Sequence, residues 1–167
     1  RIRQTGKIAI SLKDDDELVD VKLTDGHSEI LLAAANGKAI RFDEQDVRAM
    51  GRSASGVRGM NVDGSRVIGM TTNSEGEKIM IVTANGYGKM SSLDEYRLAK
   101  RGGKGVKTVN ITNKNGQLVA LRAVNGDEDL MIMTSEGIII RLPMEQVKFA
   151  GRATQGVRII NLREGDA

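Results

Sequence analysis

The chain has 167 residues, with 25 lysines and arginines against 22 aspartates and glutamates, one histidine, and no cysteine or tryptophan. The lack of cysteine excludes disulfides, thiolate zinc sites and cysteine nucleophiles, and the single histidine excludes metal sites built on two histidines. Two tyrosines and two phenylalanines are too few for a platform that stacks the bases of a single strand. No apolar run approaches the length of about 18 residues that spans a membrane. The first residue is not methionine, so we expect a piece of a longer protein.

A repeat organises the chain. Two sets of glycines recur at the same intervals of 49 and 51 residues. The first set is Gly37, Gly86 and Gly137, and the second is Gly56, Gly105 and Gly156. An upstream copy, Thr5-Gly6-Lys7-Ile8, precedes Gly56 by 50 residues. Because both sets keep one spacing across three copies, we infer repeat units at 18–62, 67–111 and 118–162, after the tail of a preceding unit at 1–12.

Each unit contains four short apolar segments that are separated by polar turns and are typical of β-strands. They lie at 19–23, 30–35, 38–42 and 57–62 in the first unit, at 67–71, 79–83, 87–91 and 106–111 in the second, and at 118–124, 130–134, 138–142 and 157–162 in the third. The pairs Asn36-Gly37, Asn85-Gly86 and Glu136-Gly137 are predicted to form two-residue hairpin turns with positive φ. Helical signal is limited to single turns, at 44–50, 93–99 and 145–150. The pattern predicts an all-β fold of propeller-like blades, about three in this chain.

Positive charge is concentrated at equivalent places in the three units. The windows 47–60, 96–109 and 147–160 contain eleven basic residues and no acidic one, whereas the rest of the chain has 14 basic and 22 acidic residues. The eleven are Arg48, Arg52, Arg58, Arg97, Lys100, Arg101, Lys104, Lys107, Lys148, Arg152 and Arg158. Nine of them form the columns 48/97/148, 52/101/152 and 58/107/158, and a fourth column, Arg41 and Arg141, is interrupted by Met90.

Columns of cations on successive blades predict an arc of charge along one rim. A phosphate backbone is the polyanion that fits such an arc, and it would be recognised by charge rather than by base sequence. The alternative is a solvated basic surface, which three acid-free windows in register make a poor explanation. Gly102, Gly103 and Gly105 are expected to form turns, and they would also let backbone N–H groups approach phosphate. The segment is not a P-loop, because the sequence lacks the pattern G-x-x-x-x-G-K-[ST].

Other candidate sites are weak. The acidic runs 14–17 and 127–129 lack the spacing of a calcium loop, so no metal site is expected. His27 is expected to be exposed, and Tyr87 and Tyr96 are expected to pack rather than to act as nucleophiles. We find no catalytic set, so this segment is not expected to be an enzyme by itself.

The segment Lys100-Arg101-Gly102-Gly103-Lys104-Gly105 resembles the gyrase A box, the signature of the C-terminal domain of the A subunit of bacterial DNA gyrase. The resemblance starts after the first position of the box, where Ala99 replaces glutamine. The segments 51–56 and 151–156 resemble degenerate boxes of the same family, and the stretch 84–89 is also similar to the family. The resemblance covers all of 1–167.

The resemblance implies a β-pinwheel, a six-bladed ring of four-stranded antiparallel blades, of which this chain would be the later blades. It implies that double-stranded DNA is bound, bent and wrapped on the basic rim, which supports negative supercoiling by an ATP-dependent type II topoisomerase. The implied partners are the rest of the gyrase A subunit and the gyrase B subunit in an A2B2 heterotetramer, in the bacterial cytoplasm at the nucleoid and without a membrane. No cofactor is expected here, since ATP and Mg would bind elsewhere in the complex.

Two alternatives remain open. One is the equivalent domain of topoisomerase IV, whose boxes are usually more eroded than 100–105. The other is a propeller that binds proteins, which predicts rims of mixed charge and exposed aromatic residues. Unpaired strand edges also lead us to expect weak self-association of this segment.

Overall fold

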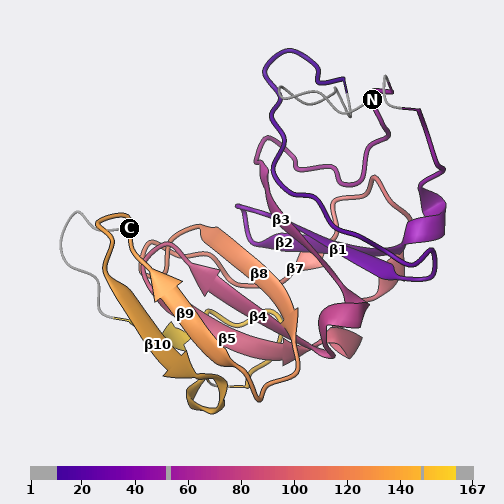
Figure 1. Ribbon diagram of the computed structural model, residues 1–167. Helices are drawn as coiled ribbons and strands as arrows, with labels where there is room; N and C mark the ends of the chain where they lie inside the picture. The colour runs from indigo at the N-terminus through magenta and orange to yellow at the C-terminus, as the bar shows by residue number, and fades with distance from the viewer. Residues whose placement is uncertain (1–10, 52–53, 148, 161–167) are drawn as a thin grey trace, which may run out of the picture.

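The computed structural model describes residues 11–51, 54–147 and 149–160. The described residues form short strands and single turns of 3-10 helix, in agreement with the predicted all-β class (Figure 1). The strands are β1 (Glu29–Ala34), β2 (Lys38–Asp43), β3 (Val67–Thr72), β4 (Lys78–Thr83), β5 (Tyr87–Ser92), β6 (Leu98–Ala99), β7 (Val106–Lys107), β8 (Leu118–Val124), β9 (Asp129–Met133), β10 (Ile139–Pro143) and β11 (Val157–Arg158). The helical turns are η1 (Glu44–Asp46), η2 (Asn73–Glu75), η3 (Leu93–Glu95) and η4 (Met144–Gln146).

Each unit contains one antiparallel hairpin: β1–β2, β4–β5 and β9–β10. The hairpins turn at Gly37, Gly86 and Gly137, which all have a φ of 86°. Each of these glycines donates its N–H to the carbonyl three residues earlier, at Ala34, Thr83 and Thr134. The predicted hairpin turns at these glycines are therefore confirmed, but only the glycine of each pair has positive φ. The preceding Asn36, Asn85 and Glu136 stay in the ordinary region, where a side chain is not strained.

The sheets do not coincide with the sequence units. The β1–β2 hairpin is extended on the β1 side by β3, and on the β2 side by β6 and β7, all from the second unit. The β4–β5 hairpin is extended in the same way by β8 and β11 of the third unit. Each of these sheets is thus completed by strands from two consecutive units, and the sequence repeat alone did not reveal this sharing.

Strand sharing explains where the strand predictions are wrong. The segment 19–23 was expected to be a strand but forms none, and the same holds for 57–62. Their counterparts pair with the hairpin of the preceding unit, and the described residues include no hairpin of a unit before the first one. The fourth strands of the other units are shortened to β7 and β11, because the chain then bends to donate two N–H groups to the carbonyl of Gly37 or Gly86.

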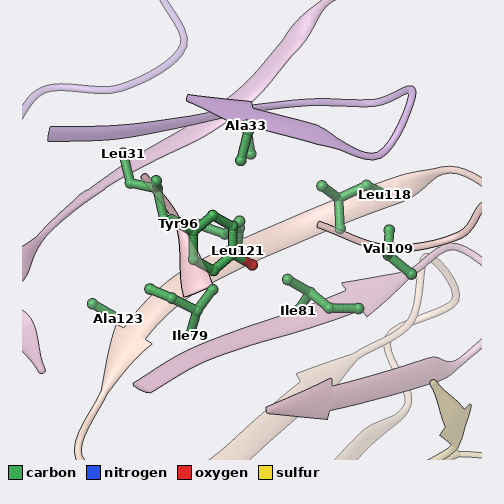
Figure 2. Close-up of a cluster of buried hydrophobic side chains, with 10 residues drawn as sticks. Leu31, Ala33, Ile79, Ile81, Tyr96, Val109, Leu118, Leu121 and Ala123 are labelled. Atoms are coloured by element: carbon green, nitrogen blue, oxygen red, sulfur yellow. The ribbon is translucent and has the colours of Figure 1, made fainter. Parts of the chain in front are cut away.

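Apolar side chains alternate along the hairpins and pack one sheet against the next. Leu31 and Ala33 of β1 face Ile79 and Ile81 of β4, and Tyr96 fills the space between them (Figure 2). Beyond β4–β5, a second cluster joins that sheet to the β9–β10 hairpin through Met80, Met90, Leu130, Leu142 and Met144. This stacking fixes the hairpins relative to each other, so that the loops on their outer edges lie at equivalent positions.

Candidate nucleic-acid interface

The box segments leave and rejoin the outer edge of a hairpin. Leu98 pairs with Arg41 in parallel before the first described box loop, and Lys107 pairs with Lys38 after it. The next loop repeats the arrangement on β5, where Phe149 bridges to Met90 and Arg158 pairs with Tyr87. The loops 100–105 and 151–156, named box 2 and box 3 below, therefore project from the same edge of successive sheets.

The structure exposes most of the predicted cations. Exposed are Arg48, Arg58, Arg97, Lys100, Lys104, Lys107 and Arg158, whereas Arg101 and Arg152 are half-buried. Arg52 and Lys148 lie outside the described residues. Gly102 and Gly105 have positive φ values of 91° and 77°, which supports their predicted role in turns, and Gly103 is exposed on the loop between them. Box 2 thus presents backbone and two lysine side chains to solvent.

The box arginines bind backbone carbonyls as well as carrying charge. Arg101 donates its Nε to the Asp46 carbonyl at 3.0 Å and its Nη1 to the Arg58 carbonyl at 3.1 Å. Arg152 donates its Nη1 to the carbonyl of Lys107, the counterpart of Arg58. Each box arginine is therefore held beside the exposed basic residue of the preceding unit. The contact brings two predicted columns together across successive sheets.

Backbone hydrogen bonds repeat the same link. Asn61 donates its N–H to the carbonyl of Gly103 at 2.8 Å, and its counterpart Asn110 donates to the carbonyl of Thr154 at 3.0 Å. In addition, the N–H of Gly102 donates to the carbonyl of Gly59 at 2.7 Å. Because the asparagine bond recurs from one unit to the next, the backbone helps to hold successive boxes at equivalent positions.

Acidic residues from outside the acid-free windows reach the rim. Asp46 lies 3.9 Å from the Lys100 ammonium, and Asp63 lies 3.6 Å from that of Lys104. The sequence windows predicted no acid near these lysines, so the rim is less purely positive than expected. Exposed pairs of this kind contribute little to stability and are weakened by salt, so both lysines stay available to phosphate.

The fourth predicted column is neutralised. Arg41 forms an ion pair with Glu29 at 2.5 Å and donates to the Tyr96 carbonyl at 2.8 Å. Arg141 pairs with Asp129, also at 2.5 Å. Both pairs join neighbouring strands of a hairpin, and each places a carboxylate directly against the arginine of this column.

Two lysines that the sequence reasoning did not single out lie at box 3. Lys114 is exposed and its ammonium lies 5.9 Å from the centre of the Tyr87 ring, which Arg158 also contacts at 5.7 Å. The lysine lies in a loop, 112–117, that is two residues longer than its counterpart 63–66 and changes the repeat interval from 49 to 51. That insertion was the signal that could have pointed to it.

Lys89 of β5 is the second, and it is buried with 1% of its surface exposed. Its Nζ donates to the carbonyls of Gly151 and Arg152 and to the hydroxyl of Thr154. Burial lowers the pKa of Lys89 to about 8, although the charge of Glu95 acts in the opposite direction. A lysine in a predicted strand is normally expected to face solvent, so nothing in the local pattern indicated this contact.

The remaining candidates have structural roles. Tyr87 and Tyr96 are buried, as expected, and the Tyr96 hydroxyl is hydrogen-bonded to Thr108. Burial raises the pKa of Tyr96 to about 12, which keeps its phenol neutral and makes it a poor nucleophile. His27 is exposed in its turn, as expected.

Over the described ranges, no three acidic, histidine or cysteine residues are grouped to hold a metal ion. None of the helical turns described is long and apolar enough to cross a membrane.

Comparison with known proteins gives one consistent family. The family described as DNA gyrase C-terminal domain, beta-propeller, matches residues 2–25, 28–74, 77–125 and 128–167. The chain is 48% identical over 168 residues to the A subunit of DNA gyrase from Staphylococcus epidermidis, which covers 99% of the chain and 19% of that protein. It is also 48% identical to the A subunit of DNA gyrase from Staphylococcus aureus over 166 residues, or 97% of the chain and 19% of the relative. The chain therefore spans about a fifth of the length of these relatives.

Two solved structures have the same architecture. A DNA gyrase A C-terminal domain matches with a TM-score of 0.90 and 25% identity, over 98% of this chain and 56% of that one. The C-terminal domain of DNA topoisomerase IV matches with a TM-score of 0.85 and 29% identity, over 92% of this chain and 48% of that one. The likeness supports the predicted β-pinwheel blades.

Proposed function

Since the chain belongs to the family of DNA gyrase C-terminal domains, we propose that it binds double-stranded DNA along the rim formed by its box segments. The observation that carries the proposal is the repeated contact between a box arginine and the carbonyl of a basic residue in the preceding unit. This contact, at Arg101 and Arg152, holds exposed cations at equivalent places on successive sheets. A phosphate backbone would meet several of them in order, and the contacts would be sequence-tolerant.

The proposal includes bending. Smooth bending of a 20–30 bp site by 40–90° costs on the order of 1–6 kcal/mol, which a single basic cluster does not offset but several clusters in register do. In the longer protein, such bending would wrap DNA and support negative supercoiling by a type II topoisomerase, in an A2B2 assembly with the gyrase B subunit at the bacterial nucleoid. ATP and Mg would be used by other parts of that assembly.

A salt series tests the binding. With roughly 5–8 phosphates neutralised, log K for a duplex should fall with log salt at a slope of about −4 to −7, and single strands should bind more weakly. A slope near zero, or a preference for single strands, would contradict the proposal and favour a protein-binding propeller.

Variants of the exposed column 58/107/158 test the continuous path. End-to-end fluorescence transfer on a duplex of about 40 bp should show less bending with each added substitution among Arg58→Ala, Lys107→Ala and Arg158→Ala. Arg122→Ala is the matched control, because Arg122 is an exposed cation on β8, at the opposite edge of the β4–β5 sheet. Bending that is lost with one substitution and unaffected by the other two would indicate a single binding site.

The likeness to the topoisomerase IV domain keeps a second parent enzyme in consideration. The two parents differ in the reaction that the domain supports, not in the binding proposed here. Replacing the matching blades of a gyrase A subunit with this chain should preserve negative supercoiling. Relaxation without supercoiling would favour topoisomerase IV.

A further inference from the structure

The two described boxes rest on different side chains at one equivalent position. Lys89 in β5 corresponds to Ile40 in β2, since the first repeat interval is 49 residues. Ile40 is buried with its Cδ1 beneath Gly103 of box 2. Lys89 is as deeply buried as Ile40 but supports box 3 with an ammonium group. One box therefore lies on an apolar side chain and the other on a cation.

The ammonium group of Lys89 makes three hydrogen bonds to one turn. Its Nζ lies 2.7 Å from the Gly151 carbonyl, 2.5 Å from the Arg152 carbonyl and 3.2 Å from the Thr154 hydroxyl. Three N–H donors are what a protonated lysine supplies, whereas the neutral amine has only two. The protonated form is thus the one that satisfies all three acceptors.

Other hydrogen bonds also hold the turn. Thr154 donates its N–H and its hydroxyl to the Gly151 carbonyl, and Arg152 donates its N–H to Glu95 Oε1 at 3.0 Å. The Nε of Arg152 is buried and has no hydrogen-bond partner among the described residues. Lys89 and Glu95 therefore bind the backbone at Arg152 itself, while the N–H of Asn110 binds the end of the turn at the Thr154 carbonyl.

The charge of Lys89 is not paired directly. Among the described ion pairs within 4 Å, none includes Lys89. The charged groups that act on it are Glu95, which favours its charged form, and Arg152, which disfavours it. The nearby Tyr96 phenol stays neutral, since burial raises its pKa to about 12. A further negative charge outside the turn would stabilise the buried ammonium.

We propose that Lys89 is a positioning residue of the rim: its ammonium group fixes the turn 151–154, and a DNA phosphate bound at box 3 stabilises that buried charge. The inference rests on the proposed function and adds to it a coupling between DNA binding and protonation. Burial holds the pKa of free Lys89 near 8, so the coupling acts at mildly alkaline pH. DNA raises this pKa, and affinity falls as pH rises through it.

The first experiment follows the Lys89 side chain by NMR, through its 13Cε shift, with and without a duplex. We expect Lys89 to titrate near pH 8 in the free chain, and about half a unit to one unit higher with DNA, or about threefold to tenfold in proton affinity. An unchanged titration with duplex bound would overturn the coupling. This measurement needs no variant to fold.

The second experiment compares duplex affinity at about pH 7 and about pH 9.5. The unsubstituted chain should lose about threefold to tenfold more affinity than Lys89→Met does over this range. Lys13→Met is the matched control, because it removes an exposed lysine beside the acidic run 14–17 and should keep the full pH dependence. Equal pH dependence in the unsubstituted chain and Lys89→Met would refute the proposal. If the unsubstituted chain binds no duplex at neutral pH, the proposed function itself fails instead.

Discussion

Box 2 and box 3 share a backbone frame but differ in chemistry. Both project from the second strand of a hairpin, and both hold an arginine against a carbonyl of the preceding unit. Box 2 has three glycines and two exposed lysines, with Gly103 over Ile40, whereas box 3 has Ala153, Thr154 and Gln155 and is bound by Lys89. The shared frame therefore depends on the hairpin edge and the arginine, while the residues between them vary.

The position of Lys104 in box 2 and of Gln155 in box 3 contacts the same loop in both units, although the residue differs. Lys104 of box 2 forms an ion pair with Asp63, in the loop that follows the preceding unit. Its counterpart Gln155 accepts hydrogen bonds from Thr112 and, through its carbonyl, from Asn115 in the equivalent loop. An ion pair at box 2 and hydrogen bonds at box 3 thus hold the equivalent two segments together.

The largest expected effect concerns the last glycine of each box. A Cβ at Gly105 would overlap the Ala39 carbonyl, whereas at Gly156 it would lie 3.0 Å from the Gly88 carbonyl oxygen and at Gly56 it would meet nothing within 4 Å. All three have positive φ, which costs a side chain about 1–2 kcal/mol. We expect Gly105→Ala to lower the free energy of unfolding by about 3 kcal/mol or more, Gly156→Ala by less and Gly56→Ala by about 1 kcal/mol. Urea denaturation measures the free energy of unfolding of each variant. Equal losses at the three sites would mean that the positive φ, and not the space around the Cβ, determines the cost.

The next effect separates charge from geometry in the box arginines. Arg101→Lys keeps the charge but loses the fork that reaches two carbonyls, so we expect it to cost about 1–2 kcal/mol of stability. Arg152→Lys should cost less, because Arg152 reaches one carbonyl and its Nε has no partner among the described residues. Thermal unfolding of both variants provides the measurement. If the Arg152 variant were the less stable, the frame of box 3 would depend on this arginine more than that of box 2 does.

The smallest effects concern exposed charge. Lys100→Ala combined with Lys104→Ala should lower affinity for every duplex alike and make the salt slope shallower by about 2, because two phosphate contacts are lost. Replacing Asp14, Asp15 and Asp16 by asparagine removes charge from the acidic region and should leave affinity unchanged or slightly raised. Binding to several duplex sequences by fluorescence anisotropy distinguishes these outcomes. A greater loss from the aspartate changes would place the DNA path away from the boxes.

The sequence was informative where structure depends on neighbouring residues. Gly37 and Gly86 predicted the hairpins, because a positive φ is a local requirement that glycine meets at low cost. The segment 19–23 was wrongly predicted as a strand, since a strand also needs a partner and its apolar pattern does not say whether one is present. Local pattern therefore predicted the hairpins but not the pairing between units.

The site was predicted in part for the same reason. The exposed positions of Lys100, Lys104 and Arg58 follow from a charge pattern visible in the sequence. The burial of Lys89 depends on a turn 62 residues away that folds over it. Likewise, the acid beside Lys104 comes from Asp63, beyond the window in which box 2 lies. Contacts between units are non-local, and one sequence without relatives contains no direct signal for them.

Strand sharing also decides what a break in the chain would do. A nick after Asn113 would leave β8 and β11 on a separate fragment, yet both would still be paired with the β4–β5 hairpin of the other. A nick at Gly76 would leave the hairpin β1–β2 joined to the downstream fragment by the two-residue ladders of β6 and β7, by separate hydrogen bonds such as those of Arg101 and Asn61, and by core packing. The first pair of fragments should therefore reassemble as a split protein far more readily than the second. Strand pairing between neighbouring units would hold the fragments together without a covalent link. The loop after Ile111 is therefore the place where a cut in the chain should disturb the fold least.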